Sequence, residues 1–146
     1  MSRPRRMIYV EETNFSRQID VLEYLRRTQK LDVIFWLCPE EKTTICGQPL
    51  ANNKLIEGEP VTTYSGVEPH KTQRTELTTE LVEEIRKSEK ILNKSCDSIV
   101  LYEQNKKTWF ACTIGHEGMC LINNKAFLEG LISSGFNASL NKPEWW

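Results

Sequence analysis

Residues 98–122 read SIVLYEQNKKTWFACTIGHEGMCLI. Three apolar runs, 98–102, 108–114 and 119–122, are separated by short turns that are either polar or flanked by glycine. Apolar runs of this length with such short connections are typical of antiparallel strands joined by hairpins. The sequence therefore predicts a three-strand meander within an antiparallel sheet.

A helix and a further hairpin are expected before the meander. Apolar residues at three-and-four spacing predict a helix from about Phe15 or Ser16, after a strand at 7–10. Residues 33–38 predict a strand buried on both faces, and the turn after it favours pairing with residues 43–46.

A second helix is expected just before the meander and a last one after it. Thr75 can cap the second helix, whose apolar stripe extends to Leu92. Asn123 or Asn124 can cap the last one, and Gly135 stands where a left-handed residue would end it. Hairpins mixed with helices favour an α+β fold, a mainly antiparallel sheet of about five or six strands with about three helices packed on it.

Length and composition bound the number of domains. The chain has 146 residues, of which 39% are hydrophobic and 27% are charged. A chain of this size can bury one core without disulfides or metals, and two full cores would not fit. We expect one domain over residues 1–146, with a flexible basic N-terminus at 1–6 and a long polar loop at 51–75.

Charge and motifs disfavour several classes of function. Lys plus Arg number 19 and Asp plus Glu 20, a balance that argues against nucleic acid as the main partner. The glycines form no phosphate-binding motif, so no nucleotide cofactor is expected. No run is long enough for a membrane helix, and the N-terminus lacks the apolar segment of a signal peptide, so the expected location is the cytoplasm with no membrane partner.

Four of the five cysteines fall in the two predicted hairpins at the same Cys-x7-Cys spacing, Cys38 with Cys46 and Cys112 with Cys120. If each turn lies midway, the members of each pair face each other across neighbouring strands. Buried thiols are the plainest interpretation, and a redox pair is the alternative. No Cys-x2-Cys knuckle is present, so no metal is expected.

The turn between Cys112 and Cys120 also holds His116 and Glu117. A histidine and a glutamate held together could act as acid and base, or the histidine could activate a thiol. An exposed turn tip is the plainer interpretation of the two residues, because no third orienting residue is apparent. This hairpin defines the alternative hypothesis, a small thiol- or His-dependent enzyme or redox protein.

Three features could contact a protein partner. Two indoles at a chain end, Trp145 and Trp146, are costly to leave in water. Docking over the chain's own core beneath Pro143 is their plainest interpretation, and insertion into a partner or a second copy is the alternative. The polar loop carries His70 and Arg74 towards its end. An acidic helix face could steer a basic partner such as a toxin or nuclease, and its residues are Glu76, Glu80, Glu83 and Glu84.

The sequence therefore favours a small non-enzymatic protein-binding module in the cytoplasm. An immunity protein, inhibitor or adaptor that binds and neutralises one protein partner fits this description. The first alternative is the enzyme hypothesis above. The second is a homodimerising, ligand-sensing domain, for which the terminal tryptophans would be the contact.

Overall fold

The computed structural model describes residues 7–38, 45–51, 57–59, 70–114 and 117–145. Within these ranges the chain forms one eight-stranded sheet, four α-helices and a short 3₁₀ helix. The strands are β1 (Ile8–Glu11), β2 (Leu31–Leu37), β3 (His70–Lys71), β4 (Thr75–Glu76), β5 (Cys96–Glu103), β6 (Trp109–Ile114), β7 (Met119–Ile122) and β8 (Ala138–Ser139). The helices are α1 (Phe15–Thr28), α2 (Thr79–Lys87), α3 (Glu89–Ser95), α4 (Leu128–Ser133) and the 3₁₀ helix η2 (Lys125–Phe127).

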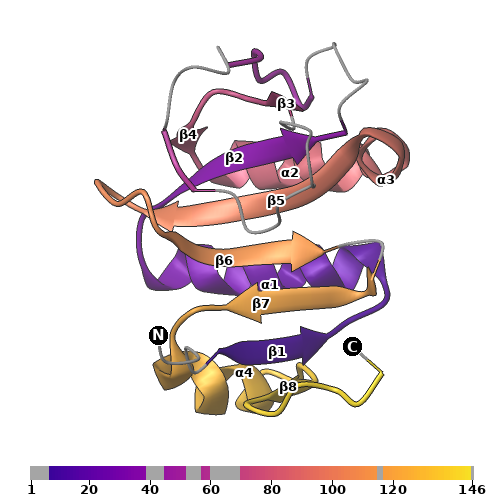
Figure 1. Cartoon of the computed structure of the whole chain (residues 1–146), viewed down its shortest axis with the longest axis vertical. Coiled ribbons are helices and arrows are strands. Elements are labelled where there is room, and N and C mark those ends of the chain that lie inside the picture. Colours follow the sequence, from indigo (N-terminus) through magenta and orange to yellow (C-terminus); the bar gives the residue numbers. More distant parts are fainter. Residues whose placement is uncertain (1–6, 39–44, 52–56, 60–69, 115–116, 146) are drawn as a thin grey trace.

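The strands lie in the order β3-β2-β5-β6-β7-β1-β8, and β4 also pairs with β2 (Figure 1). Every pairing is antiparallel. The α+β class is confirmed, and the predicted meander is β5, β6 and β7. The sheet has more strands than expected because β3, β4 and β8 contain two residues each, too few for a periodic pattern.

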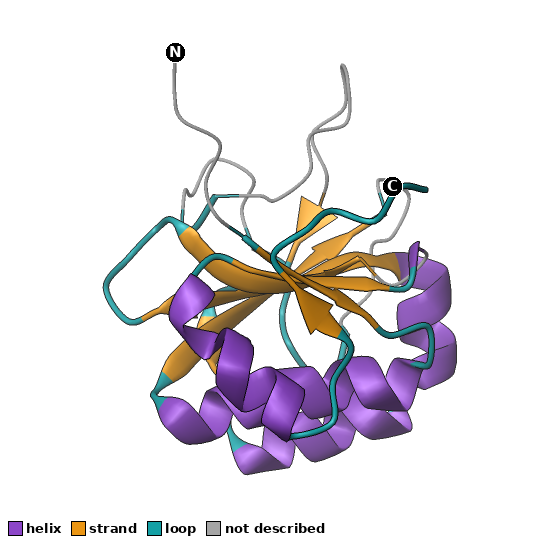
Figure 2. Ribbon diagram, turned by 90° about the horizontal axis from the view of Figure 1, so that it is seen from below, coloured by secondary structure: helices purple, strands orange, loops and turns teal. Residues whose placement is uncertain are grey.

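The helices gather on one side of the sheet (Figure 2). The first begins where the sequence predicts, at Phe15, because the side chain of Asn14 accepts a hydrogen bond from the backbone N–H of Arg17 at 3.3 Å. Among the described residues, no helix combines the length and apolar character needed to cross a bilayer.

The second predicted helix starts later than expected and is interrupted. Thr75 lies in β4, paired with Val33, and the capping residue is Thr78, whose Oγ1 accepts from the N–H of Leu81 at 3.1 Å. The helix breaks at Ser88, which ends α2 and precedes α3. Because residues 75–76 pair with β2 as the strand β4, the N-cap of α2 is Thr78, three positions after the predicted Thr75.

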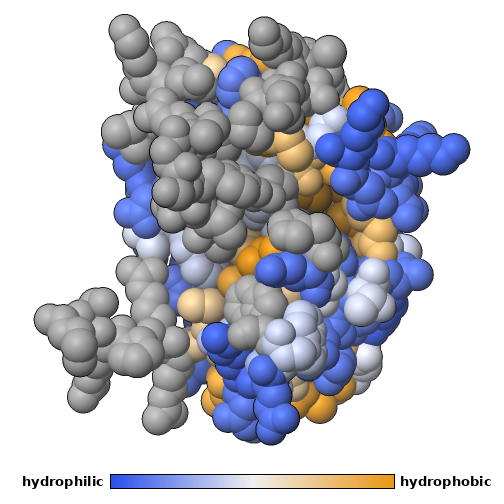
Figure 3. All heavy atoms as spheres, turned by 45° about the vertical axis from the view of Figure 1, so that its right-hand side comes forward, coloured by the Kyte–Doolittle hydropathy of each residue, from blue (hydrophilic) through white to orange (hydrophobic). Residues whose placement is uncertain are grey.

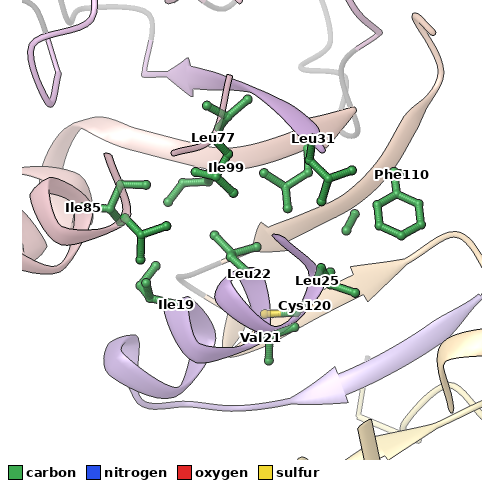
Figure 4. Close-up of a cluster of buried hydrophobic side chains, with 14 of the residues drawn as sticks. Ile19, Val21, Leu22, Leu25, Leu31, Leu77, Ile85, Ile99, Phe110 and Cys120 are labelled. Atoms are coloured by element: carbon green, nitrogen blue, oxygen red, sulfur yellow. The ribbon is translucent and has the colours of Figure 1, made fainter. Parts of the chain in front are cut away.

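The main core lies between the helices and the sheet. In Figure 4, Ile19 and Leu22 of α1 point towards Ile85 of α2 and Ile99 of β5. All four side chains are at most 3% exposed. Burial of such side chains is the main stabilising contribution to the fold.

The opposite face of the sheet carries a second apolar cluster. Its fully or nearly fully buried members are Ile34, Trp36, Val100, Tyr102, Cys112, Ile114, Met119 and Leu121. The described chain crosses this face at Gly58 and Glu59, where the hydroxyl of Tyr102 donates to the carbonyl of Glu59 at 2.6 Å. The sheet is therefore apolar on both faces, with helices on one of them.

The hairpin expected after β2 is wrong for the residues that the structure describes. Ile45 forms an isolated bridge with Gln48, and β2 pairs with β3, β4 and β5 instead. Residues 39–44 lie outside the described ranges, as do the N-terminus at 1–6 and residues 52–56 and 60–69 of the predicted polar loop. The last part of that loop contains β3 and β4.

Candidate functional site

The two cysteines of the predicted thiol site, Cys112 and Cys120, do not face each other. Cys112 is opposite Leu121, and Cys120 is opposite Thr113. Cys112 consequently belongs to the second apolar cluster, whereas Cys120 belongs to the core beneath the helices. The prediction that they face each other is wrong by one residue of register, and such a shift moves a side chain to the other face.

The chemistry of these thiols is that of buried groups. Cys112 and Cys120 are 0% and 1% exposed. Burial raises the pKa of the Cys120 thiol well above its usual range, which opposes formation of the nucleophilic thiolate. Glu117 is exposed, and His116 lies outside the described residues. Among the described residues of this hairpin, burial thus keeps the Cys120 thiol protonated.

Cys38 and Cys46, the other predicted pair, do not lie on paired strands. Cys38 follows β2, with its sulfur 3.8 Å from the carbonyl oxygen of Lys94. Cys46 lies in a left-handed turn with φ of 52°, and burial raises the pKa of its thiol. All five cysteines are free of disulfides. In the described part of the chain, no three metal-ligating side chains gather at one place.

Arg74, a predicted partner contact, is used inside the molecule. Its guanidinium donates to Asp32 Oδ2 at 2.8 Å and to the carbonyls of Glu57, Lys106 and Glu103 at 2.7, 2.6 and 2.9 Å. It also lies 4.9 Å from the centre of the Tyr102 ring. With its side chain 13% exposed, Arg74 joins the segment around Glu57 to the sheet. His70 is half-buried in β3, opposite Leu37.

The predicted acidic residues do reach solvent. Glu76, Glu80, Glu83 and Glu84 are all exposed. Among the ion pairs of the described residues, none involves these four. Their carboxylates are therefore available to a partner. The prediction that all four share a helix face is wrong for Glu76, which lies in β4 opposite Asp32, whereas Glu80, Glu83 and Glu84 lie on α2.

Exposed large hydrophobic side chains concentrate near the C-terminus. Of the four in the described part of the chain, Ile132, Leu140 and Trp145 belong to this segment, with 53%, 38% and 59% exposure, and Ile91 at 41% is the fourth. Figure 3 shows hydrophobic side chains among hydrophilic ones at the lower end of the molecule, where α4 and β8 lie in Figure 1. Trp146 lies outside the described residues.

Trp145 is held in place without being buried. Its indole N–H donates to Glu11 Oε2 at 3.3 Å. Glu11 is the last residue of β1, and its own backbone N–H donates to the carbonyl of Asn137 at 3.0 Å. Sequence reasoning missed Glu11, because the contact joins residues 134 positions apart and no local pattern indicates it.

The segment that leads to Trp145 is fixed to the first helix. Arg17 of α1 donates to the carbonyl of Gly135 at 2.9 Å and lies 4.6 Å from the centre of the Phe136 ring. Glu12 accepts from Arg17 Nε at 3.4 Å and from the backbone N–H of Asn137 at 3.2 Å. These contacts hold residues 135–137 beside the end of β1, where Glu11 contacts Trp145.

Comparisons of the chain with models of known protein families, with curated proteins and with solved structures gave no match. Its function is therefore inferred from its own residues.

Proposed function

We propose that the chain is a non-enzymatic protein-binding module of the immunity, inhibitor or adaptor kind, and that Trp145 is its principal contact with one protein partner. The observation that carries this proposal is a tryptophan that is hydrogen-bonded to Glu11 and still 59% exposed. Tryptophan is enriched among the residues that dominate binding energy at interfaces. Ile132 and Leu140 add exposed apolar area to the same segment.

The acidic residues support a second part of the proposal, electrostatic steering of the partner, with less weight. Glu76, Glu80, Glu83 and Glu84 would steer a basic partner electrostatically without being the main source of affinity. In Figure 1, α2 and the C-terminal segment lie at opposite ends of the sheet. We therefore assign the direct contact to Trp145.

The alternatives receive less support. A redox pair would need Cys112 and Cys120 together, and they lie on opposite faces of the sheet. A homodimer would use the same exposed tryptophan, so the oligomeric state is part of the test. The five free thiols fit a reducing compartment, which supports the proposed cytoplasmic location.

The partner can be captured through the proposed contact itself. A photoreactive phenylalanine analogue at position 145 should cross-link one protein in lysate of the source cell, whereas the same analogue at position 91 should not. Ile91 is the matched control, because it is also an exposed hydrophobic residue, at 41%, and lies on α3. Equal cross-linking from both positions would contradict the assignment.

The affinity of the captured protein then gives the energetic test. Trp145→Ala should weaken binding about 30-fold, equivalent to the ~2 kcal/mol of a typical hot spot. Ile91→Ala should leave the affinity unchanged within about twofold. If light scattering instead shows a dimer that Trp145→Ala converts to monomer, the homodimer alternative replaces the proposal.

A further inference from the structure

The chain builds one three-part contact twice, from an arginine, a carboxylate and an aromatic ring. Arg17 pairs with Glu12 at 3.4 Å and lies over the Phe136 ring, 4.6 Å from its centre. Arg74 pairs with Asp32 at 2.8 Å and lies 4.9 Å from the centre of the Tyr102 ring. In both, the planar guanidinium meets a ring and a carboxylate together, an arrangement that combines cation–π attraction with a charge-assisted hydrogen bond.

A third carboxylate and ring are present without the arginine. Glu11 Oε2 accepts from the indole N–H of Trp145 at 3.3 Å, which fixes the indole relative to the carboxylate. Among the described residues, no cationic side chain lies within 4.0 Å of Glu11. The neighbouring Glu12, by contrast, is already paired with Arg17, at 3.4 Å.

The position beside Glu11 and over the Trp145 ring, which an arginine fills in the other two contacts, suits a guanidinium from another molecule. More than half of the surface of Trp145 is exposed, and Glu11 supplies a negative charge beside it. A guanidinium can stack on the ring while its fork of N–H groups donates to the carboxylate. A lysine ammonium has neither the flat face nor the fork, so this site should discriminate between the two cations.

We propose that Glu11 and Trp145 form a receptor for an arginine side chain of the protein partner. This inference rests on the proposed function, because it names the chemistry that the Trp145 contact recognises. The partner is a protein that presents an arginine from an accessible segment, and that arginine completes the third contact of this type.

The receptor can be tested before the partner is known. The indole N–H signal of Trp145 is assigned by NMR from its loss in Trp145→Phe and is followed during titration with N-acetyl-arginine methylamide. N-acetyl-lysine methylamide serves as the matched probe. The arginine probe should produce a saturating shift, with an affinity about 2- to 5-fold higher than that of the lysine probe.

Glu11→Gln removes the charge and keeps an oxygen that can accept from the indole. It should weaken binding of the arginine probe about 2- to 5-fold, while Glu129→Gln, at an exposed glutamate of α4, should not. Absence of saturation, equal affinity for the two probes, or full affinity in Glu11→Gln would each overturn the receptor.

The affinities of the captured partner for the two variants, Trp145→Ala and Glu11→Gln, distinguish this inference from the proposed function. If Trp145→Ala weakens partner binding and Glu11→Gln does not, the protein-binding function stands and the arginine receptor fails. If neither substitution changes partner affinity, the assignment of Trp145 as principal contact fails first.

Discussion

Gly58 shows how one small residue sets the course of a segment across the sheet. A Cβ at this position would lie 2.5 Å from Tyr102 Cε2 and 2.6 Å from its Cζ. The Tyr102 hydroxyl accepts from Trp36 Nε1 at 3.2 Å and donates to the carbonyl of Glu59 at 2.6 Å, which holds the ring in place. Because the ring cannot easily move, only glycine allows the backbone to pass directly over it.

Gly58→Ala should therefore destabilise the fold by about 1–3 kcal/mol, the usual range for overpacking a tight site. Urea unfolding measures this free energy. The penalty should be smaller in a Tyr102→Phe background, which keeps Cε2 and Cζ but loses the hydroxyl bonds that hold the ring, and smallest in Tyr102→Leu, which removes both atoms. An equal penalty in both backgrounds would show that the ring contact is not its cause.

At the scale of elements, the sequence pattern predicted those strands whose positions depend on neighbouring residues in the chain. The turns at 104–107 and 115–118 lie between apolar runs, and β5, β6 and β7 follow. The strands β3, β4 and β8 escaped prediction because distant partners hold them. Thr72, between β3 and β4, is an example, since its Oγ1 accepts from the N–H of Phe35, 37 positions away.

The candidate site was also predicted only where neighbouring residues determine it. The position of two tryptophans at a chain end indicated a contact either with the chain's own core or with a partner, and Trp145 is 59% exposed. Its partner Glu11 could not be inferred, because the contact depends on β8 pairing with β1. The cysteine pairing failed because the placement of a turn by one residue decides which face a side chain occupies.

The C-terminal segment should depend on a single side chain of α1. Arg17→Ala removes the donor to Gly135 and the cation over Phe136, so local opening of residues 135–139 should become easier by about 1 kcal/mol. Hydrogen exchange at the Glu11 amide, which donates to Asn137, should then accelerate about fivefold. The Leu101 amide in β5 should be unaffected.

Arg27→Ala provides the control for that experiment. Arg27 lies in the same helix, is 74% exposed and pairs with Glu23. Faster exchange at Glu11 in this variant as well would indicate general weakening of α1 and contradict a specific role of Arg17.

At the scale of the whole molecule, two buried apolar layers enclose groups that ionise at alkaline pH. Cys120 lies in the layer beneath the helices and Tyr102 in the layer on the opposite face. Burial raises the pKa of both, because neither anion can be solvated there. The fold consequently keeps both groups protonated at pH values where the unfolded chain loses their protons.

The sign of the resulting pH dependence follows from linkage. Stability is fully present below the pKa of the unfolded thiol, about 8.5, and is lost as the pH rises above it, by up to about 1.4 kcal/mol per pH unit for each group. Cys120 should contribute to this loss of stability first, and Tyr102 from about pH 10.

Urea unfolding at pH 7.5, 9 and 10 under reducing conditions measures the decline in the free energy of unfolding. Cys120→Ala should begin less stable, because it leaves a small cavity, yet lose less stability between pH 8.5 and 10. An identical decline in wild type and Cys120→Ala would mean that the buried thiol does not link the fold to alkaline pH.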